Sequence, residues 1–378
     1  MPKTIKKVAV IGSGVMGSGI AAHCANAGCE VLLLDIVDDE SSDRNIIAKN
    51  AIKYMHKSNP EMLMQRKNSK LITPGNIDDD LHKLIDCDWV IEVIIENLDI
   101  KKKLYKKLAQ NIGKDTILSS NTSTIPRSEL ITDMANDLSS RFLITHFFNP
   151  PRYLPLLEVV SSPEVNADVL DRFCTFADID LGKRVTICND SPGFIGNRLG
   201  IYFIQRAYKA TIDHGLSIEQ ADAMLGRPIG LPKTAVFALM DLVGIDLIPH
   251  VTGSLVSHLG ENDPFHKIAG VGKDTITSMI DEGYTGRKGK GGFYRLNREN
   301  GKKIKEARSL ITGEYKTAKR KAGFSSAKMG KRGIAEIMDC DDKGAEFVSD
   351  VLLDSLSYAA YIVPEVSEDI YAIDGAMK

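Results

Sequence analysis

Short apolar runs recur along the first half of the chain, and each has the length of a single buried strand. Runs of this kind, bounded by glycine or polar residues, are typical of strands that are covered on both faces. Between the first two runs lies a helical stretch from about Val15 to Ala27, which ends at Gly28, a favourable residue just past a helix. A strand, a helix and a second strand within about 30 residues predict a parallel sheet with helices on both faces. The predicted strands cover residues 8–11, 31–34, 89–95, 116–119, 142–145, 156–160 and 184–188.

The pattern changes at Asp190-Ser191-Pro192-Gly193, beyond which few strand-like runs appear. Apolar residues then recur at helical spacing, and Ser217 with Gln220 forms the capping-box pattern that opens a helix. The sequence therefore predicts the α/β class. We expect a Rossmann-type doubly wound sheet over residues 1–188, which binds a nucleotide, followed by an all-helical domain over residues 189–294.

Residues 295–332 are rich in lysine and arginine. Such a segment could be an arm that binds an anion or a nucleic acid, or a solvated linker. We favour the basic linker because no aromatic residues alternate with the charges. From Gly333 to Lys378 the chain is again apolar, acidic and helical in pattern.

Composition narrows the class of protein further. The chain has 378 residues, of which 43% are hydrophobic and 26% charged, and its formal net charge is −2. This balance is that of an ordinary soluble globular protein and gives no sign of a nucleic-acid partner. The six cysteines form no CxxC pair and no cluster with histidine, so we expect buried thiols in a reducing compartment and no metal site. No apolar run approaches the roughly 20 residues of a membrane span, and we expect a cytoplasmic protein.

A glycine pattern lies between the first predicted strand and the first predicted helix. Gly12 permits a tight turn, Gly14 lets the backbone approach a pyrophosphate, and Gly17 lets helix and strand pack closely. The amides at the helix N-terminus then face the phosphates. Met16 within this loop is interpreted either as a contact on the cofactor side or as core filling.

An acidic residue follows at the end of the second strand. Asp35 stands 18 residues past Gly17, where a carboxylate can accept hydrogen bonds from ribose hydroxyls. The next three residues supply no cation for a 2′-phosphate, so the pattern favours NAD over NADP. The alternative is a plain tight turn with a solvated aspartate. We favour NAD binding because all parts of the fingerprint coincide.

A histidine and a glutamate form the candidate catalytic pair. His146 stands at the end of a predicted strand, and the carboxyl ends of strands face the ligand crevice in doubly wound sheets. Glu158 lies inside the apolar run Leu156–Val160, where an ionised carboxylate needs a partner. A glutamate beside an imidazole fixes its tautomer and suits it to accept a hydroxyl proton. The alternative, a satisfied core histidine, remains open from these residues alone.

At this point the chain resembles a known family. His146-Phe147-Phe148-Asn149-Pro150, followed by Pro155-Leu156-Leu157-Glu158-Val159, closely resembles the 3-hydroxyacyl-CoA dehydrogenases. The resemblance covers about residues 5–294 with its motifs in order, so the helical domain is expected to be the dehydrogenase C-terminal domain. Further matching motifs are Val10–Gly17, Ile91–Leu98, Ser120–Ser123, Ser191–Ile195, Asp241–Asp246 and Gly286–Tyr294.

The resemblance implies a role for each matching residue. His146 is similar to the family's general base and Glu158 to the residue that orients it. Ser123 resembles the residue that hydrogen-bonds the substrate oxygen at C3, and Asn149 the one that orients the reacting group. On the cofactor side the resemblance implies Glu96 and Lys101, although Lys101 could instead lie on a solvated helix face.

One position departs from the family pattern. Asp190 stands where single-domain relatives carry asparagine, so a substrate contact there is in doubt, and it could instead cap the helix that follows. The implied reaction is the NAD-dependent oxidation of a 3-hydroxyacyl-CoA in fatty acid β-oxidation. Two rivals remain: an inactive relative kept for binding, and a β-hydroxyacid dehydrogenase acting on a free acid.

The end of the chain extends past the resemblance to single-domain relatives. Residues 370–378 resemble the opening of a second helical repeat in larger multifunctional members of the family. We therefore expect residues 295–378 to comprise the basic linker and the start of that repeat. An apolar face left uncovered there would favour a homodimer, or association with a missing C-terminal portion.

Overall fold

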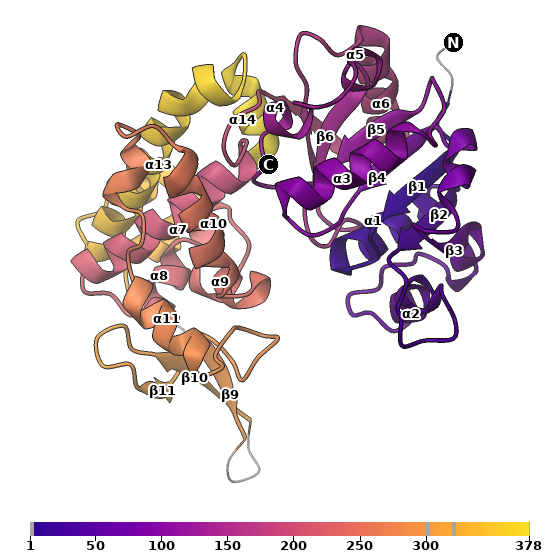
Figure 1. Cartoon of the computed structure of the whole chain (residues 1–378). Helices are drawn as coiled ribbons and strands as arrows, with labels where there is room; N and C mark the ends of the chain where they lie inside the picture. The colour runs from indigo at the N-terminus through magenta and orange to yellow at the C-terminus, as the bar shows by residue number, and fades with distance from the viewer. Residues whose placement is uncertain (1–3, 299–302, 320–322, 378) are drawn as a thin grey trace. The chain divides into compact units, whose positions relative to one another are not determined.

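The computed structural model describes residues 4–298, 303–319 and 323–377. The chain divides into two compact units, and each is described by itself. The first unit comprises Met1–Gly196 and Val363–Lys378, and the second comprises Asn197–Ile362. Along the chain, the strands and helices of the first unit precede those of the second unit. The exception is the last helix, Ile370–Met377, which belongs to the first unit (Figure 1).

The first unit contains an eight-stranded sheet. Its strand order is β3-β2-β1-β4-β5-β6-β7-β8, in which β7 runs antiparallel to β6 and all other neighbouring pairs are parallel. Order reverses between β1 and β4, which is where doubly wound sheets bind their ligand. The strands are β1 (Lys7–Ile11), β2 (Glu30–Asp35), β3 (Ile72–Asn76), β4 (Trp89–Glu92), β5 (Ile117–Ser120), β6 (Phe142–Phe147), β7 (Leu156–Val160) and β8 (Arg184–Cys188).

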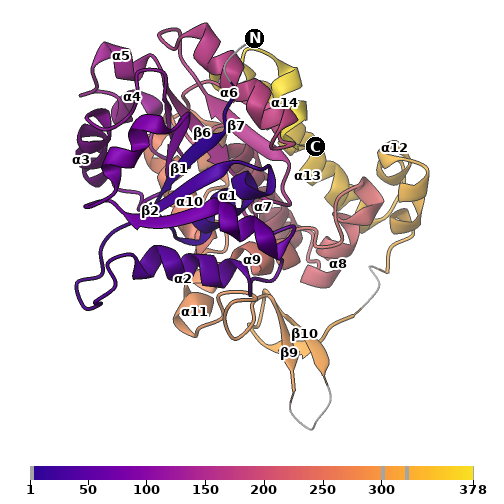
Figure 2. The same ribbon diagram turned by 90° about the vertical axis from the view of Figure 1, so that its right-hand side faces the viewer.

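Helices cover both faces of this sheet. On one face the fully buried Trp89 packs edge-on against Phe173 and Phe176 of α6. On the other face Tyr105 of α3 packs against Phe142 of β6. Figure 2 shows α1 and α3 on opposite sides of the strands. The helices of this unit are α1 (Val15–Asn26), α2 (Ile46–Met55), α3 (Leu98–Ala109), α4 (Arg127–Leu130), α5 (Asn136–Ser139), α6 (Ala167–Ile179) and α14 (Ile370–Met377).

The structure confirms the predicted doubly wound sheet, and it adds one strand that the sequence analysis omitted. Every predicted strand is present, although the strand from Trp89 ends at Glu92 rather than at Ile95. The omitted strand is β3, which contains Pro74 and Gly75. Proline cannot donate to a ladder and glycine weakens a strand, so both hide a strand from pattern reading. Since β3 is an edge strand, the missing donor of Pro74 is tolerated.

Helices dominate the second unit. The predicted capping box is confirmed, because the Ser217 hydroxyl accepts from the Gln220 amide and the Gln220 side chain accepts from the Ser217 amide. A buried ion pair joins Arg198 to Asp263, which also accepts from the Tyr358 hydroxyl at 3.0 Å. The helices are α7 (Gly196–Asp213), α8 (Ile218–Met224), α9 (Phe237–Val243), α10 (Leu247–His258), α11 (Lys273–Asp281), α12 (Ile334–Met338) and α13 (Lys343–Val366).

A small antiparallel sheet lies where the sequence analysis expected a linker. Its strands are β9 (Tyr294–Asn297), β10 (Ile304–Arg308) and β11 (Tyr315–Thr317), in the order β11-β10-β9. Cross-strand pairs hold it: Arg295 lies 2.7 Å from Glu306, and its guanidinium lies over the Tyr315 ring. Such pairs stabilise strands that have no apolar face, and they are invisible to a search for apolar alternation. Part of the predicted linker, residues 299–302 and 320–322, lies outside the described residues.

The last helix belongs to the first unit. α14 packs against β8, and the Asn189 amide donates to the Val366 carbonyl at 2.9 Å. The sequence analysis expected a second helical repeat to begin here. In the structure these residues form α14, which covers β8, an edge strand that has no further neighbour in the sheet.

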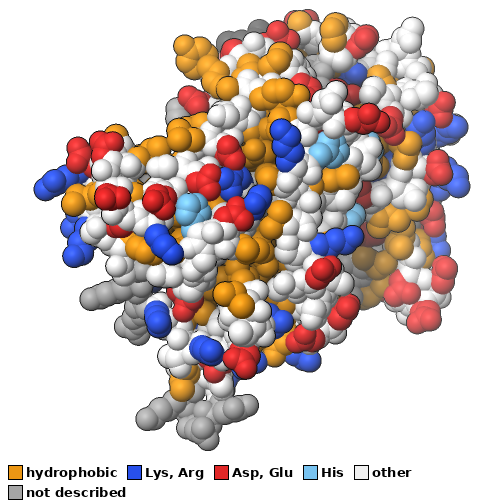
Figure 3. All heavy atoms as spheres, turned by 90° about the vertical axis from the view of Figure 1, so that its left-hand side faces the viewer, with side chains coloured by type: hydrophobic (Ala, Val, Ile, Leu, Met, Phe, Trp, Pro, Cys, Tyr) orange, Lys and Arg blue, Asp and Glu red, His pale blue; other side chains and the backbone are white. Residues whose placement is uncertain are grey.

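The surface mixes charges of both signs. Figure 3 shows one face of the molecule, on which basic and acidic side chains are interspersed and apolar side chains lie exposed between them. Among the helices of the described ranges, none alone is long and apolar enough to cross a membrane. α9 and α10 pass such a test only together, and the chain bends by 94° between them.

All six cysteines are free, and four are buried; burial raises the pKa of Cys29 and Cys87 to about 11.

Candidate functional site

The glycine loop between β1 and α1 has room for glycine alone at two of its three positions. Gly12 has a φ of 102°, and a Cβ there would lie 2.5 Å from the Val93 carbonyl oxygen. A Cβ on Gly17 would lie 1.9 Å from the Gly12 carbonyl oxygen. Gly14 differs, because nothing lies within 4 Å of its Cβ position. The first and third glycines thus serve the fold, while the space over Gly14 leaves the backbone open to a ligand.

Asp35 closes the other side of this loop. Its carboxylate accepts from the Ser13 amide at 2.6 Å, the Ser13 hydroxyl at 2.5 Å and the Ile36 amide at 2.7 Å. These bonds fix the carboxylate at the rim of a pocket of about 380 Å³ between the glycine loop and α2. Three of the roughly four lone-pair sites of the carboxylate are thus used, and the remaining one, on Oδ1, can still accept from a ribose hydroxyl. The pocket is lined by Ser13, Gly14, Val15, Ser18, Asp35, Ile47, Asn50, Ala51 and Tyr54.

This pocket fits the adenosine half of a dinucleotide. It combines an apolar wall, a ribose acceptor and an open helix N-terminus for the phosphates. Ser13 is a residue that the sequence analysis missed, although its position between two loop glycines was a signal. Met16 packs partly buried against the core of the unit, which agrees with its core-filling interpretation.

His146 and Glu158 face each other across β6 and β7. The antiparallel register pairs these two residues directly. His146 Nδ1 lies 2.7 Å from Glu158 Oε2, with the histidine side chain 7% exposed and the glutamate fully buried. Among the residues that the structure describes, none bonds the Nε2 of His146. The arrangement leaves this nitrogen free to exchange a proton with a bound molecule.

The second oxygen of Glu158 is held by backbone. Its Oε1 accepts from the Ile195 amide at 2.9 Å and the Gly196 amide at 2.7 Å. A Cβ on Gly196 would lie 2.6 Å from the Phe148 ring, so a larger residue there would have to displace that ring. Two amide donors compensate the burial of the charge, and they fix which oxygen faces the imidazole. The sequence analysis did not foresee this anchor.

Ser123 and Asn149 lie on the loops that follow β5 and β6. The Asn121 side-chain oxygen accepts from the Phe147 amide at 2.9 Å, which ties the Ser123 loop to the strand end that carries His146. The Ser123 amide donates to Glu96 Oε1 at 3.0 Å. Asn149 is exposed, just past the end of β6. Both predicted residues therefore lie at the carboxyl edge of the sheet.

A buried charge cluster joins β4, α3 and the Ser123 loop. Lys101 is 1% exposed, so the interpretation as a solvated helix face is wrong. Its Nζ lies 2.7 Å from Glu92 Oε1 and 3.1 Å from Glu96 Oε2. Glu92 also accepts from the hydroxyls of Tyr105 at 2.6 Å and Ser120 at 2.7 Å.

The two carboxylates of the cluster differ in surroundings. Glu92 is fully buried, whereas the Glu96 side chain is 27% exposed and also accepts from the Thr122 hydroxyl. Burial alone would raise the pKa of Glu96, but the Lys101 ammonium and the Thr122 hydroxyl hold it below its usual value. Sequence analysis missed Glu92. The signal was available, because Glu92 is an acid inside the apolar run that begins at Trp89.

Asp190 caps a helix other than the expected one. Its carboxylate accepts from the Arg127 amide at 2.6 Å and the Ser128 amide at 2.8 Å, which are the first amides of α4. The expectation that it caps the following helix is therefore wrong. The reason is spatial: β8 and the Ser123–Pro126 loop end at the same edge of the sheet, so α4 is the nearer set of free amides. Asp190 thus fixes the far end of the loop that carries Ser123.

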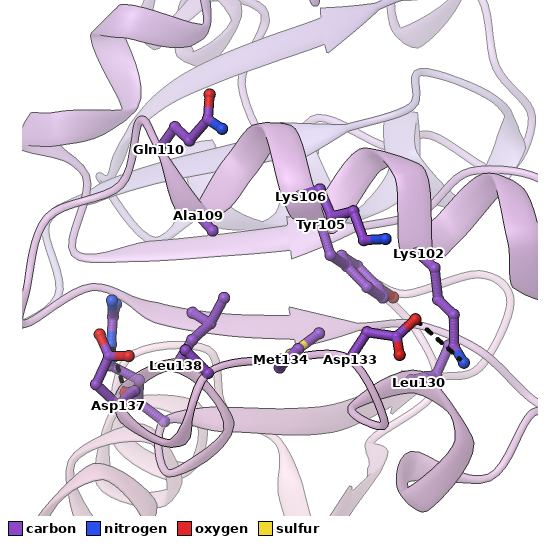
Figure 4. Close-up of a pocket in the computed structure, with 12 residues that line it drawn as sticks. Lys102, Tyr105, Lys106, Ala109, Gln110, Leu130, Asp133, Met134, Asp137 and Leu138 are labelled. Carbon is purple, nitrogen blue, oxygen red and sulfur yellow. Dashed lines mark hydrogen bonds and ion pairs between the residues drawn. The ribbon is translucent and has the colours of Figure 1, made fainter.

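A second pocket lies on the α3 side of the sheet (Figure 4). Its volume is about 450 Å³, and Lys102 faces Asp133 across it at 3.8 Å. None of the predicted site residues lines this pocket. Tyr105 points into it, but the hydroxyl of that residue is bonded to Glu92. The pocket therefore lies outside the candidate site.

The fold and the site define a dinucleotide-binding protein of the doubly wound class. Residues 7–191 match the family described as 3-hydroxyacyl-CoA dehydrogenase, NAD binding domain. Residues 193–296 match the 3-hydroxyacyl-CoA dehydrogenase, C-terminal domain. The chain belongs to the 3-hydroxyacyl-CoA dehydrogenase family, whose first domain binds NAD.

Individual relatives agree with this assignment. A Deinococcus radiodurans protein named "Probable 3-hydroxyacyl-CoA dehydrogenase" is 41% identical over 295 residues, 78% of this chain and 84% of the relative. A Rickettsia felis protein, whose name describes a trifunctional enzyme of a fatty acid oxidation complex, is 41% identical over all of this chain and 52% of its own length. The chain thus spans about half the length of the first curated relatives it matches.

Solved structures show the same fold. The 3-hydroxybutyryl-CoA dehydrogenase of Escherichia coli matches with a TM-score of 0.63 and 29% identity, over 76% of this chain and 58% of that one. FadB2 of M. tuberculosis matches with a TM-score of 0.63 and 26% identity, over 78% of this chain and all of that one.

Proposed function

We propose that this chain oxidises (S)-3-hydroxyacyl-CoA to 3-ketoacyl-CoA with NAD, as a step of fatty acid oxidation. The observation that carries the proposal is the His146–Glu158 pair, 2.7 Å apart, at the same sheet edge as the glycine loop. Relatives named for 3-hydroxyacyl-CoA and for a fatty acid oxidation complex support the substrate class. The chain spans about half the length of the first curated relatives, and we propose the same activity for any longer protein that contains it.

His146 acts as the general base in this proposal. Nδ1–H donates a hydrogen bond to Glu158, so the lone pair of the neutral imidazole lies on Nε2 and can take the hydroxyl proton of the substrate. When Nε2 becomes protonated, the buried carboxylate stabilises the imidazolium ion. Bound NAD supplies the hydride acceptor at the substrate carbon.

The remaining predicted residues position the reactants. Ser123 donates its hydroxyl hydrogen to the substrate oxygen at C3, and Asn149 orients the reacting group. Gly12, Gly14 and Gly17 shape the phosphate loop, and Asp35 receives the adenosine ribose. Glu96 contacts the cofactor side, since its partly exposed carboxylate lies next to the Ser123 amide.

The test is an NADH oxidation assay with acetoacetyl-CoA and with a long-chain 3-ketoacyl-CoA. His146→Ala should lower kcat/KM by about 10²–10⁴-fold, the usual contribution of a general base. His82→Ala, at an exposed histidine of the same unit, is the matched control and should keep full activity. A loss below tenfold in His146→Ala would mean that another group is the base.

The same assay separates the rival functions. Turnover of free acetoacetate but not of its CoA ester would indicate a β-hydroxyacid dehydrogenase. NAD binding without turnover of either substrate would indicate an inactive relative.

A further inference from the structure

The buried cluster beneath the Ser123 loop carries an unbalanced charge. It contains two carboxylates, Glu92 and Glu96, and one ammonium group, Lys101, which lies within 3.1 Å of both. Tyr105 and Ser120 contribute neutral hydroxyls to Glu92, and Thr122 contributes one to Glu96. The formal charges of the two carboxylates and the one ammonium group add to −1. One net negative charge is therefore fixed in this part of the sheet edge.

This charge lies beside the dinucleotide loop. Glu92 is the last residue of β4, the strand next to β1 in the sheet. The next residue, Val93, contacts Gly12 so closely that a Cβ on the glycine would lie 2.5 Å from the Val93 carbonyl oxygen. From the other side, the Ser123 amide donates to Glu96. The cluster thus lies between the phosphate loop and the loop proposed to contact the substrate.

We propose that Glu92, through Lys101 and Glu96, makes this site select the oxidised cofactor over the reduced one. The inference rests on the proposed function, in which NAD binds at this edge of the sheet. The nicotinamide ring carries a positive charge in NAD⁺ and none in NADH, so a fixed negative charge stabilises only the oxidised form. Two carboxylates face one ammonium, so neutralising Glu92 leaves Lys101 and Glu96, whose formal charges cancel.

Lys101 has a different role here from that of a cofactor contact. Its ammonium group is 1% exposed and is already held by two carboxylates, so little of it is accessible to a ligand. It acts as a positioning residue that places Glu96 next to the Ser123 amide. Removing Lys101 and the charge of Glu92 together leaves Glu96 as the one charge, so the net value returns to −1.

The experiment measures dissociation constants of NAD⁺ and NADH for the full chain by calorimetry and NADH fluorescence. At a protein effective dielectric constant near 20, a change of one unit charge roughly 10 Å from a cation corresponds to about a tenfold change in affinity. Glu92→Gln should shift the ratio by about tenfold toward NADH. The double variant Glu92→Gln/Lys101→Met should restore it to within about threefold of wild type.

Tyr105→Phe is the matched control, because it removes a hydrogen bond to the Glu92 carboxylate without changing charge. Its ratio should stay at the wild-type value. If Glu92 only stabilised the fold, the double variant should bind both cofactors most weakly of all the variants. The ratio of the two dissociation constants should then show no selective change.

Each outcome decides between the two proposals. An unchanged ratio in folded Glu92→Gln, or no recovery in the double variant, overturns the inference. If Glu92→Gln does not fold, Glu96→Gln at the partly exposed end of the cluster makes the same charge change, and an unchanged ratio there overturns it as well. Wild-type protein that binds neither cofactor, or binds both without turnover of CoA esters, contradicts the proposed function instead.

Discussion

Replacing Glu158 by glutamine tests the orientation of the imidazole. In the wild type, Oε1 accepts from two backbone amides and Oε2 faces His146 Nδ1. Glutamine has one oxygen and one NH₂ group. The two amides of Ile195 and Gly196 can only donate, so they hold the glutamine oxygen, and its NH₂ group must then point at Nδ1.

This inversion changes the tautomer of the histidine. An NH₂ group that donates to Nδ1 forces the imidazole proton onto Nε2, where the substrate hydroxyl needs an acceptor. The aspartate-to-asparagine change in a serine-protease triad acts in the same way and lowers kcat by about 10⁴-fold. We expect a loss of about 10³–10⁴-fold in kcat here, which corresponds to roughly 4–5.5 kcal/mol of activation free energy.

The assay is steady-state NADH formation from a 3-hydroxyacyl-CoA at saturating NAD⁺, the direction in which Nε2 must accept the hydroxyl proton. KM for NAD⁺ should stay near its wild-type value, because Glu158 lies at β7 and not at the glycine loop. The melting temperature should change little, since both backbone amides keep an acceptor. Glu164→Gln, at a glutamate whose side chain is 69% exposed, is the control for a surface charge change. A folded Glu158→Gln protein with more than a tenth of wild-type kcat would refute the tautomer argument.

Three further predictions concern the cofactor rim, the Ser123 loop and the second unit. Asp35→Ala removes the ribose acceptor and the partner of the Ser13 amide, so the Kd for NAD, measured by calorimetry, should rise by at least about tenfold; an unchanged Kd would remove Asp35 from the site. Asp190→Ala leaves the first two amides of α4 without their acceptor, so the free energy of unfolding in denaturant should fall by about 1–2 kcal/mol. Asp190→Asn keeps one acceptor oxygen and should lose less stability. Equal stability of the wild type and both variants would contradict the capping role. Burial raises the pKa values of Asp222 and Asp241 to about 6, above the usual 3.8, so each binds its proton more tightly in the folded state. Their stabilisation is complete below the unfolded pKa and is lost as the pH rises through about 6. The free energy of unfolding should therefore increase from pH 7 to pH 5, by roughly 1.3 kcal/mol per group, and Asp222→Asn should flatten this dependence.

Sequence reasoning succeeded where one element carries its own pattern. The strands of the first unit are buried on both faces, so each appears as a continuous apolar run that needs no knowledge of its neighbours. β3 and the β9–β11 sheet lack this pattern. In β3, Pro74 and Gly75 interrupt it, and in β10 the pairing of Glu306 with Arg295 replaces apolar contacts. Their stability depends on partners far along the chain, which spacing alone does not reveal.

The same distinction applies to the site. Glu158 was predicted because an acid inside an apolar run needs a partner, and the register of β6 with β7 supplies one. Glu92 met the same criterion, but its partner was hidden. Lys101 is followed directly by Lys102 and Lys103, and such a run of lysines is typical of a solvated helix face. The carboxylates of Glu158 and Asp190 both accept hydrogen bonds from backbone amides. Since every residue carries an amide, no side-chain pattern marks these contacts before the fold brings them together.

The turn that holds Glu158 contains a residue in a strained backbone conformation. Phe194 adopts a φ of 49°, which costs an L-residue with a bulky side chain about 1–2 kcal/mol. This conformation is what aims the next two amides, of Ile195 and Gly196, at one oxygen of Glu158. A glycine at position 194 would avoid the strain, but it would remove the ring that lies 5.8 Å from the imidazole of His146. The turn therefore combines two requirements: donors for the buried carboxylate, and an apolar wall that keeps water from the imidazole. The strained backbone at Phe194 thus serves the pair indirectly. It places the amides that orient Glu158, and Glu158 in turn orients the imidazole of His146.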